Sequence, residues 1–328
     1  MTSDRPGTTA DGAGAPLPDA AASGGPPVAP DAAGAGFRSG FCALVGRPNV
    51  GKSTLLNALV GTPVAITTPV PQTTRHAVRG VLHGDGLQVV FVDTPGLHKA
   101  RTLLGDRLND VARDALGDVD VVLFVVDGAG GVGTGDRFVA RLLEPYAERT
   151  IAVVNKVDRI GRARQLPAIA AVAELGAWSE VVPVSARDGE GVDVVRDLIV
   201  ARLPEGPPYF PPEQVTDQSI VQRVAELVRE QAIIRMREEV PHSVAVLVEE
   251  LLPGSREDLT VVHATVFVER DSQKGIVIGH HGAVLRDIGS TARPRIEALL
   301  GTDVYLDLRV KLLKDWQGNP RALDRLGY

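Results

Sequence analysis

Short apolar runs alternate with helical segments along the first two thirds of the chain. Each run has the length and β-branched content of a buried strand, and only the third contains a charge, Asp120. Strands that are apolar throughout lie in sheets that are covered on both faces, so the pattern predicts an α/β domain with a mostly parallel sheet and helices on both faces. The predicted strands are residues 41–45, 87–92, 119–126, 151–154 and 181–184.

The last third of the chain has a different order of elements. Apolar residues at helical spacing predict a helix at 218–237, with one buried side formed by Ile220, Val224, Leu227 and Ile234. The order helix, two strands, two helices, strand then predicts a small α+β domain with a short tail. The strands are expected at 243–251, 259–268 and 304–310, and the last helix is expected to end at about Leu300.

Proline and glycine divide the chain into parts. Residues 1–36 are mostly Ala, Gly, Pro and Asp and have few large apolar side chains, which predicts a disordered tail without the apolar segment of a secretory signal. Prolines crowd residues 204–212 and interrupt helices and central strands alike. We therefore predict a tail at 1–36, a nucleotide-binding domain at 38–204, a linker at 205–214 and a second domain at 215–328.

Composition excludes several classes of protein. No apolar run approaches the roughly 18 residues of a membrane span, so any membrane contact is expected to be peripheral. The single cysteine, Cys42, excludes an internal disulfide, lies in a predicted buried strand and suits a reducing cytosol. The net charge of −6 argues against binding nucleic acid by overall charge. Any RNA site must be local, and basic residues outnumber acidic ones between Arg270 and Lys314.

A phosphate-binding loop follows the first predicted strand. Its glycines allow backbone N–H groups to surround phosphates at the start of a helix. Lys52 is expected to neutralise the β- and γ-phosphates, and the Ser53 hydroxyl to ligate Mg²⁺. The loop comprises Gly46, Arg47, Pro48, Asn49, Val50, Gly51, Lys52, Ser53 and Thr54.

Two further segments complete the predicted phosphate site. Asp93-Thr94-Pro95-Gly96-Leu97 follows the strand at 87–92, so Asp93 is expected near Mg²⁺ and the Gly96 N–H near the γ-phosphate. The polar segment Thr67–His76 is expected to supply a threonine to the magnesium shell when the γ-phosphate is bound. We favour Thr74 over Thr73. The alternative is a mobile loop without this role.

The nucleotide base is predicted from two more strand ends. Asn155-Lys156-Val157-Asp158 follows the strand at 151–154, and the Asp158 carboxylate accepts from both N1–H and the 2-amino group of guanine, a pair that adenine lacks. Ser185-Ala186-Arg187, after the strand at 181–184, is expected to support the base through backbone groups. The predicted cofactors are therefore GTP or GDP with Mg²⁺.

A second glycine motif predicts an RNA site. Gly279-His280-His281-Gly282 has the form of the GXXG turn with which KH domains hold single-stranded RNA. Its histidines carry little charge at neutral pH, so phosphate attraction is expected to be weak, and no ligand-spaced Cys or further His supports a metal site instead. Trp316 is as readily a packing residue as a base-stacking one. The predicted RNA-binding residues are Lys274, Gly279, His280, His281, Gly282, Arg286, Lys311 and Lys314.

Together these motifs resemble the Era family of bacterial GTPases, over a stretch from about Gly40 to Leu313. The resemblance implies a GTPase domain followed by a type II KH domain. It also implies a cytoplasmic protein, partly peripheral at the cell membrane, that binds the 3′ region of small-subunit (16S) ribosomal RNA and assists assembly of the small ribosomal subunit. We expect a monomer.

Hydrolysis is expected to be slow. Ras-like enzymes place a water-orienting glutamine directly after the Gly of this motif, whereas this chain has Leu97. With Lys52, Thr74 and Gly96 as the catalytic groups, we expect a rate of about 10⁻³ s⁻¹ or below. Two other functions stay open: a constitutive RNA-binding protein with a structural nucleotide, and a GTPase of RNA modification, although no separate catalytic motif supports the second.

Overall fold

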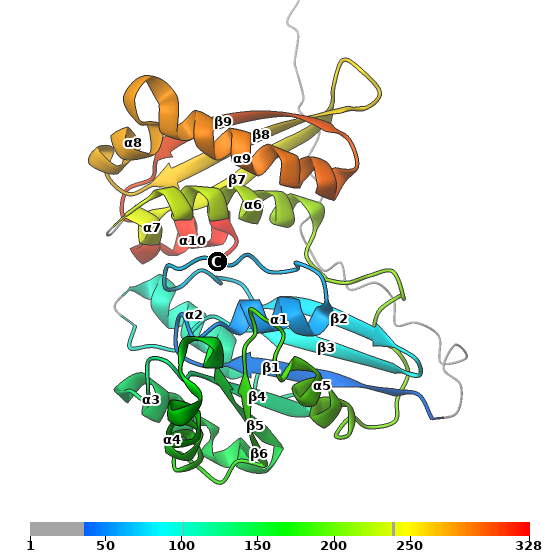
Figure 1. Cartoon of the computed structure of the whole chain (residues 1–328). Coiled ribbons are helices and arrows are strands. Elements are labelled where there is room, and N and C mark those ends of the chain that lie inside the picture. The colour runs from blue at the N-terminus through cyan, green and yellow to red at the C-terminus, as the bar shows by residue number, and fades with distance from the viewer. Residues whose placement is uncertain (1–35, 101, 238–239) are drawn as a thin grey trace, which may run out of the picture.

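The molecule consists of two layered domains, one above the other in Figure 1. The computed structural model describes residues 36–100, 102–237 and 240–328. Apart from Gly36, the tail predicted at 1–36 lies outside the described residues. None of the helices in these ranges is long and apolar enough to cross a membrane.

The first domain is built on a six-stranded sheet with the order β2-β3-β1-β4-β5-β6. All neighbouring strands are parallel except β2 and β3. The predicted strands are therefore confirmed with small changes of their bounds. The six strands are β1 (Arg38–Val45), β2 (Val78–Gly84), β3 (Leu87–Asp93), β4 (Val121–Asp127), β5 (Thr150–Asn155) and β6 (Glu180–Val184).

Helices cover both faces of this sheet, as predicted (Figure 1). Helices α1 (Lys52–Val60) and α5 (Val192–Val200) pack on one face through a core that includes Leu55 and Val195. Cys42 is a fully buried member of that core, and burial raises the pKa of its thiol, as does nearby Asp120. The other face is covered by α2 (Leu103–Asp114), α3 (Thr134–Leu143) and α4 (Arg162–Ala173).

Two local features of this domain differ from the prediction. The antiparallel edge strand β2 was not predicted, although the Asp85-Gly86 pair that joins it to β3 is a common hairpin signal. Asp120 does not interrupt a strand, because β4 begins at Val121. The Asp120 carboxylate instead accepts a hydrogen bond from the Phe41 N–H at 2.8 Å, which ties the start of β4 to β1.

The second domain is a three-stranded sheet with the order β7-β8-β9 and helices packed against it. The predicted order of helix, two strands, two helices and strand is confirmed, with a short helix α7 inserted before the first strand. The elements are α6 (Ile220–Arg235), α7 (Val240–Ser243), β7 (Ala245–Pro253), β8 (Leu259–Val268), α8 (Asp271–Ile278), α9 (Ala283–Leu300), β9 (Asp303–Leu312) and α10 (Pro320–Leu326).

The buried side of α6 was predicted only in part: Val224 is buried and Leu227 packs against the domain core, whereas the other two predicted residues do not. Its fully buried residues are Val224, Val228 and Ala232, which recur every four residues and pack into the domain core. Ile220 and Ile234 are about half exposed instead. Helix α6 contacts both the sheet of the second domain and the first domain. Its buried residues therefore lie on more than one side of the helix, and the apolar pattern alone does not identify them.

The predicted short tail is also a structured element. After β9 the chain forms a single 3₁₀ turn, Trp316–Gly318, and then helix α10. Trp316 is fully buried, so it is a packing residue, and its indole N–H donates to the Ser243 carbonyl at 3.0 Å. It packs in one apolar cluster with Leu323 and Leu326 of α10 and with Leu104 and Leu108 of α2. This cluster joins the two domains.

Candidate nucleotide site, RNA groove and the contact between them

The five parallel strands bring the nucleotide motifs to one edge of the sheet. Strands β1, β3, β4, β5 and β6 end at Val45, Asp93, Asp127, Asn155 and Val184. Ligands of open α/β sheets bind outside the carboxyl ends of the strands. The segments that follow β1, β3, β5 and β6 are the four predicted nucleotide motifs, so the fold gathers them around one site.

The loop at 46–51 has the backbone of a phosphate cradle. Gly51 precedes α1 with a φ of 97°, and a Cβ there would lie 2.4 Å from the Asn155 Nδ2 atom, so glycine is required for two reasons. The Lys52 ammonium is buried and donates to the Gly46 and Arg47 carbonyls, both at 3.3 Å. Burial lowers the pKa of Lys52, and the nearby Asp93 carboxylate partly opposes this effect.

Three oxygen atoms converge beside Lys52. The Ser53 Oγ donates to Asp93 Oδ2 at 2.6 Å, and the Thr74 Oγ1 lies 2.9 Å from Ser53 Oγ and 3.2 Å from Asp93 Oδ2. The other oxygen of Asp93, Oδ1, is buried without a hydrogen-bond partner among the described residues. Burial raises the pKa of Asp93, and Lys52 opposes this effect. A carboxylate with an unpaired buried oxygen beside two hydroxyls fits a hard cation such as Mg²⁺.

The structure separates the two candidate threonines. Thr73 Oγ1 donates to the Val70 carbonyl at 2.8 Å and lies 2.5 Å from Thr68 Oγ1, which keeps it inside the loop. Only Thr74 reaches Ser53 and Asp93. This arrangement favours Thr74 as the magnesium ligand, which stays a prediction.

The two base-recognition segments contact each other. Asn155 donates to the Val50 carbonyl at 2.8 Å and accepts from the Ala186 N–H at 3.0 Å, so it joins the phosphate loop to the loop after β6. The Asp158 carboxylate accepts from Ser185 Oγ at 2.9 Å and pairs with Arg187 at 3.1 Å. The carboxylate is thus held in place at the predicted guanine site.

Lys156 was predicted only as part of a motif, and the structure shows which groups its side chain binds. Its ammonium donates to the Asn49 carbonyl and to Asp127 Oδ2, the latter at 2.7 Å. Burial opposes ionisation of Asp127, but the bonds from Lys156 and from backbone N–H groups keep the pKa of Asp127 below its usual value. Lys156 therefore connects the phosphate loop to the ends of β4 and β5.

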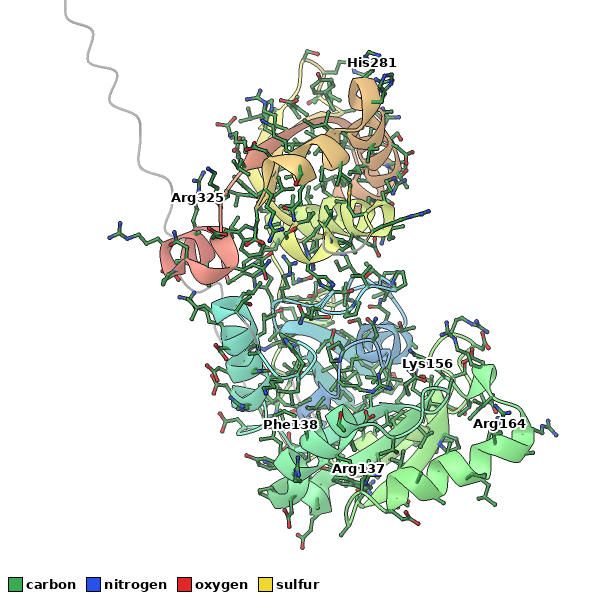
Figure 2. All side chains as sticks on the ribbon, turned by 90° about the vertical axis from the view of Figure 1, so that its left-hand side faces the viewer. Arg137, Phe138, Lys156, Arg164, His281 and Arg325 are labelled. Atoms are coloured by element: carbon green, nitrogen blue, oxygen red, sulfur yellow. The ribbon has the colours of Figure 1, made fainter. Side chains whose placement is uncertain are left out.

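The predicted RNA turn lies at the far end of the second domain, where Figure 2 labels His281. Gly279 has a φ of 71°, and a Cβ there would lie 2.5 Å from Val284 Cγ2, so a side chain does not fit. His281 also has a positive φ, 50°, and Arg286 donates to its carbonyl at 2.9 Å. Val284 and Arg286, at the start of α9, thus fix the conformation of the turn.

A groove of about 400 Å³ begins at this turn and runs between α9 and β9. Gly282 and Arg286 of the predicted set line it. Sequence reasoning missed Ser290, Arg293 and the 60% exposed ring of Tyr305, which line it too, because only the fold brings β9 beside α9. The remaining predicted residues are not among the described residues that line this groove: Lys274, Gly279, His280, His281, Lys311 and Lys314. The first four lie in or before the turn, and Lys311 pairs with Glu249 at 3.0 Å.

The segment Thr67–His76 also contacts the second domain, which the sequence did not predict. Arg75 is buried and donates to the carbonyls of His242 and Val244, each at 2.7 Å. Its guanidinium lies over the rings of Trp316 and Tyr328, at 5.4 and 5.6 Å from the ring centres. Arg75 is therefore a buried cation of the first domain whose hydrogen-bond partners belong to the second domain.

Helix α6 holds the same segment from the other side. Arg229, which is almost fully buried, donates to the Thr73 carbonyl, and Glu230 accepts from the Thr67 N–H at 3.2 Å. Glu226 in turn accepts from Arg229 at 2.7 Å. Helix α6 of the second domain thus binds the segment at Thr67 and at Thr73.

Comparisons with known proteins agree with this geometry. A family model described as "50S ribosome-binding GTPase" matches residues 41–156, and a KH domain model matches 239–317. GTPase Era of Mycobacterium avium (strain 104) is 52% identical over 296 residues, which cover 89% of this chain and 99% of that protein. GTPase Era of Mycobacterium tuberculosis (strain ATCC 25177 / H37Ra) is 50% identical over 297 residues, with the same coverage.

Two solved structures are similar over the same length. Era in complex with MgGDPNP and nucleotides 1506–1542 of 16S ribosomal RNA has a TM-score of 0.87 and 39% identity, covering 89% of this chain and 99% of that one. A single-residue variant of Aquifex aeolicus Era bound to GDP·AlF4⁻ has a TM-score of 0.86 and 38% identity, with the same coverage.

Proposed function

Because the chain belongs to the Era family of GTPases, it is a hydrolase of GTP that works with Mg²⁺, and we propose that it switches an RNA-binding domain during ribosome assembly. The RNA is the 3′ region of 16S ribosomal RNA, which the similar Era structure contains. The small ribosomal subunit is then the assembly partner. The observation that carries the proposal is the pair Thr74 and Arg75, adjacent residues that contact the magnesium site and the KH domain.

The contacts support the following roles at the nucleotide. Lys52 neutralises phosphate charge, Ser53, Thr74 and Asp93 hold Mg²⁺, and the Gly96 N–H faces the γ-phosphate. When bound between Ser53, Thr74 and Asp93, Mg²⁺ would offset the negative charge that develops on the phosphates during hydrolysis. The guanine base lies against Asp158, with the backbone of 185–187 beside it.

The switch would act through the hydrogen bonds of the segment Thr67–His76. Loss of the γ-phosphate and of Mg²⁺ would leave Thr74 with only its hydrogen bonds to Ser53 and Asp93. Any movement of Thr74 displaces Arg75 from the carbonyls of His242 and Val244. These bonds are charge-assisted and buried, so each is worth about 1.5–3 kcal/mol, enough to bias an equilibrium between two domain arrangements.

The direct test compares RNA affinity in two nucleotide states. An oligonucleotide with the 3′ sequence of 16S ribosomal RNA is titrated against the protein with GDP and with a non-hydrolysable GTP analogue. We expect the two dissociation constants to differ at least fivefold, because allosteric coupling is typically 1–3 kcal/mol. Equal constants would favour a constitutive RNA-binding protein with a structural nucleotide.

Arg75→Met tests the route of the coupling. This change keeps the length of the side chain and removes the guanidinium, so we expect the ratio of the two RNA dissociation constants to fall toward one while GTP affinity is kept. Arg137→Met is the matched control, because Arg137 is exposed on α3 and makes no ion pair within the described residues. A ratio that survives in Arg75→Met contradicts the proposed route.

We also propose a cytoplasmic monomer, part of which contacts the inner face of the cell membrane. Five exposed arginines of α3, of α4 and of the turn before α4 make no ion pair among the described residues, and Phe138 of α3 and Leu166 of α4 are exposed as well. Arginines interspersed with apolar groups suit an anionic lipid surface. The arginines are Arg137, Arg141, Arg159, Arg162 and Arg164; Figure 2 labels the first and last of them on this domain. Sedimentation with anionic vesicles, lost in Arg162→Glu/Arg164→Glu, is the test.

A further inference from the structure

Leu97 cannot orient the water that attacks GTP. Its side chain is apolar, fully buried and packed in the core cluster on the side of the sheet covered by α2, α3 and α4. The residue that plays this role in Ras-like enzymes must expose an amide at the γ-phosphate. A different residue must therefore provide a hydrogen-bond acceptor for the water.

The next residue, His98, makes two hydrogen bonds that determine its tautomer. Its Nδ1 lies 2.9 Å from the Gly96 carbonyl, and a carbonyl only accepts, so Nδ1 carries the proton. In the neutral ring Nε2 is then an acceptor. Nε2 lies 2.8 Å from the side-chain nitrogen of Gln72, which therefore donates to it.

This contact sets the direction of the Gln72 amide. One N–H of the NH₂ group is donated to His98, and an amide nitrogen does not accept, so the carbonyl oxygen Oε1 is the atom that can accept a hydrogen bond from a ligand or water. Gln72 is half-buried and lines a cavity of about 60 Å³ together with Lys52, Thr74 and Gly96, the groups placed at the γ-phosphate. An amide acceptor thus lies at the wall of the phosphate cavity.

The loop that carries Gln72 is held in an unusual conformation. Gln72 has a φ of 63°, in the left-handed region that costs a non-glycine residue free energy. The loop is tied down nearby, because Asn49 of the phosphate loop donates to the Pro69 carbonyl at 2.9 Å and Thr73 donates to the Val70 carbonyl. Such a conformation persists because the contacts around it hold it.

We infer that Gln72 orients the attacking water and that His98 is a positioning residue that holds the Gln72 amide in the productive direction. Gln72 Oε1 accepts a hydrogen bond from the water and takes no proton. The water oxygen forms a bond to the γ-phosphorus, the bond from that phosphorus to the bridging oxygen breaks, and its electron pair leaves with GDP. One water proton passes to a γ-phosphate oxygen, and the product is dihydrogen phosphate. The inference rests on GTP hydrolysis at this site.

Single-turnover hydrolysis of GTP by the full-length protein tests the inference. For Gln72→Ala we expect the rate to fall about 100-fold, the effect of losing one preorganised polar group in a transition state. GTP affinity, measured with a fluorescent analogue, should change less than about threefold, because the lost bond goes to water rather than to the nucleotide. Lys99→Ala, an exposed neighbour of His98, is the control with unchanged rate.

His98 is tested through its dependence on Gln72. For His98→Ala we expect a rate about tenfold lower, and for the double variant a rate equal to that of Gln72→Ala, since His98 acts only through the amide. Formation of the complex with GDP and aluminium fluoride should weaken in Gln72→Ala while GDP binding stays the same.

The possible outcomes distinguish a failure of the assigned GTP hydrolysis from a failure of the role inferred for Gln72. A wild-type protein that binds GTP but does not hydrolyse it overturns the assigned activity itself. Normal wild-type hydrolysis with an unchanged rate in Gln72→Ala overturns only the role of Gln72, and so does a loss of GTP affinity that accounts for the whole decrease. A double variant slower than Gln72→Ala overturns the positioning role of His98.

Discussion

Single residues of the nucleotide site were predictable because their motifs are local in sequence. Asp93 ends β3, the segments with Lys52, Ser53 and Asp158 follow β1 and β5, and parallel strands bring their carboxyl ends together. The partners of Arg75 and the contact of Gln72 with His98 were not predictable. Those contacts join segments that are 26 to 253 residues apart in the sequence, and no periodic pattern records such a pairing.

Base selection gives a prediction at the residue scale. In Asp158→Asn one acceptor of the carboxylate becomes a donor that faces the donors of guanine, so we expect GTP affinity to fall at least 100-fold, about 3 kcal/mol. The same change should improve binding of xanthosine triphosphate, whose 2-oxo group accepts the new donor. Fluorescent-nucleotide titration measures both. Asp188→Asn, at an exposed carboxylate of the neighbouring loop, serves as the control. Equal loss in both variants contradicts a role of Asp158 in base selection.

At the scale of elements, strands were predicted correctly where both of their faces are buried, because the side chains on both faces are then mostly apolar. Strands β1, β4 and β5 are buried on both faces and appeared as continuous apolar runs. Strand β2 lies at the edge of the sheet, with exposed Arg79, and lacks such a run. Helix α10 is short, and its burial depends on contacts with α2 that only the docked domains provide.

The interface between elements predicts a dependence of stability on pH. His76 stacks on Tyr328 with ring centres 4.8 Å apart, and burial lowers its pKa below 6.5. Glu226 opposes that effect, whereas Arg229 and Arg75 add to it. Below pH 6.5 the unfolded chain binds a proton at this residue that the folded protein does not. The free energy of unfolding should therefore decrease as pH falls from 7 to 5.5.

Urea denaturation across this pH range measures the effect. His76→Gln should remove part of the slope, because an amide does not titrate. His280→Gln, at an exposed histidine of the RNA turn, is the control variant. Glu226 contributes separately at lower pH: burial opposes its ionisation, but Arg229 keeps the pKa of Glu226 below 4.5. A slope that is the same in the His76 and His280 variants contradicts the assignment.

At the scale of the whole molecule, charge limits how RNA is held. The chain carries a net charge of −6, so its affinity cannot come from a general positive potential. The proposed phosphate contacts are Lys274, Arg286, Lys311 and Lys314, of which Lys311 is already paired with Glu249. Shape and stacking in the groove beside Tyr305 must then supply much of the binding.

The salt dependence of RNA binding tests this limit. Single strands release about 0.7 counterions per phosphate contact, so three contacts predict a slope of about −2 in a plot of log affinity against log salt. Lys311→Gln should leave that slope unchanged, whereas Arg286→Gln should reduce its magnitude by about 0.7. Titrations between about 50 and 300 mM KCl, over which the Debye length changes about 2.5-fold, give the slopes. A smaller slope in Lys311→Gln would show that Lys311 leaves Glu249 for RNA.

The neighbouring positions of Thr74 and Arg75 have a mechanical consequence. Consecutive Cα atoms are about 3.8 Å apart across a rigid peptide unit, so Thr74, the proposed magnesium ligand, is joined directly to Arg75, which binds the other domain. The two hydrogen bonds of Arg75 are 2.7 Å long, and each is lost once its donor and acceptor are about 3.6 Å apart. Movement of the Thr74 backbone is therefore passed directly to the Cα atom of Arg75. A one-residue insertion between Thr74 and Arg75 would separate the contact with Ser53 from the contact with Val244 while leaving both domains folded. The spacing of these two residues therefore constrains how either domain can change in evolution.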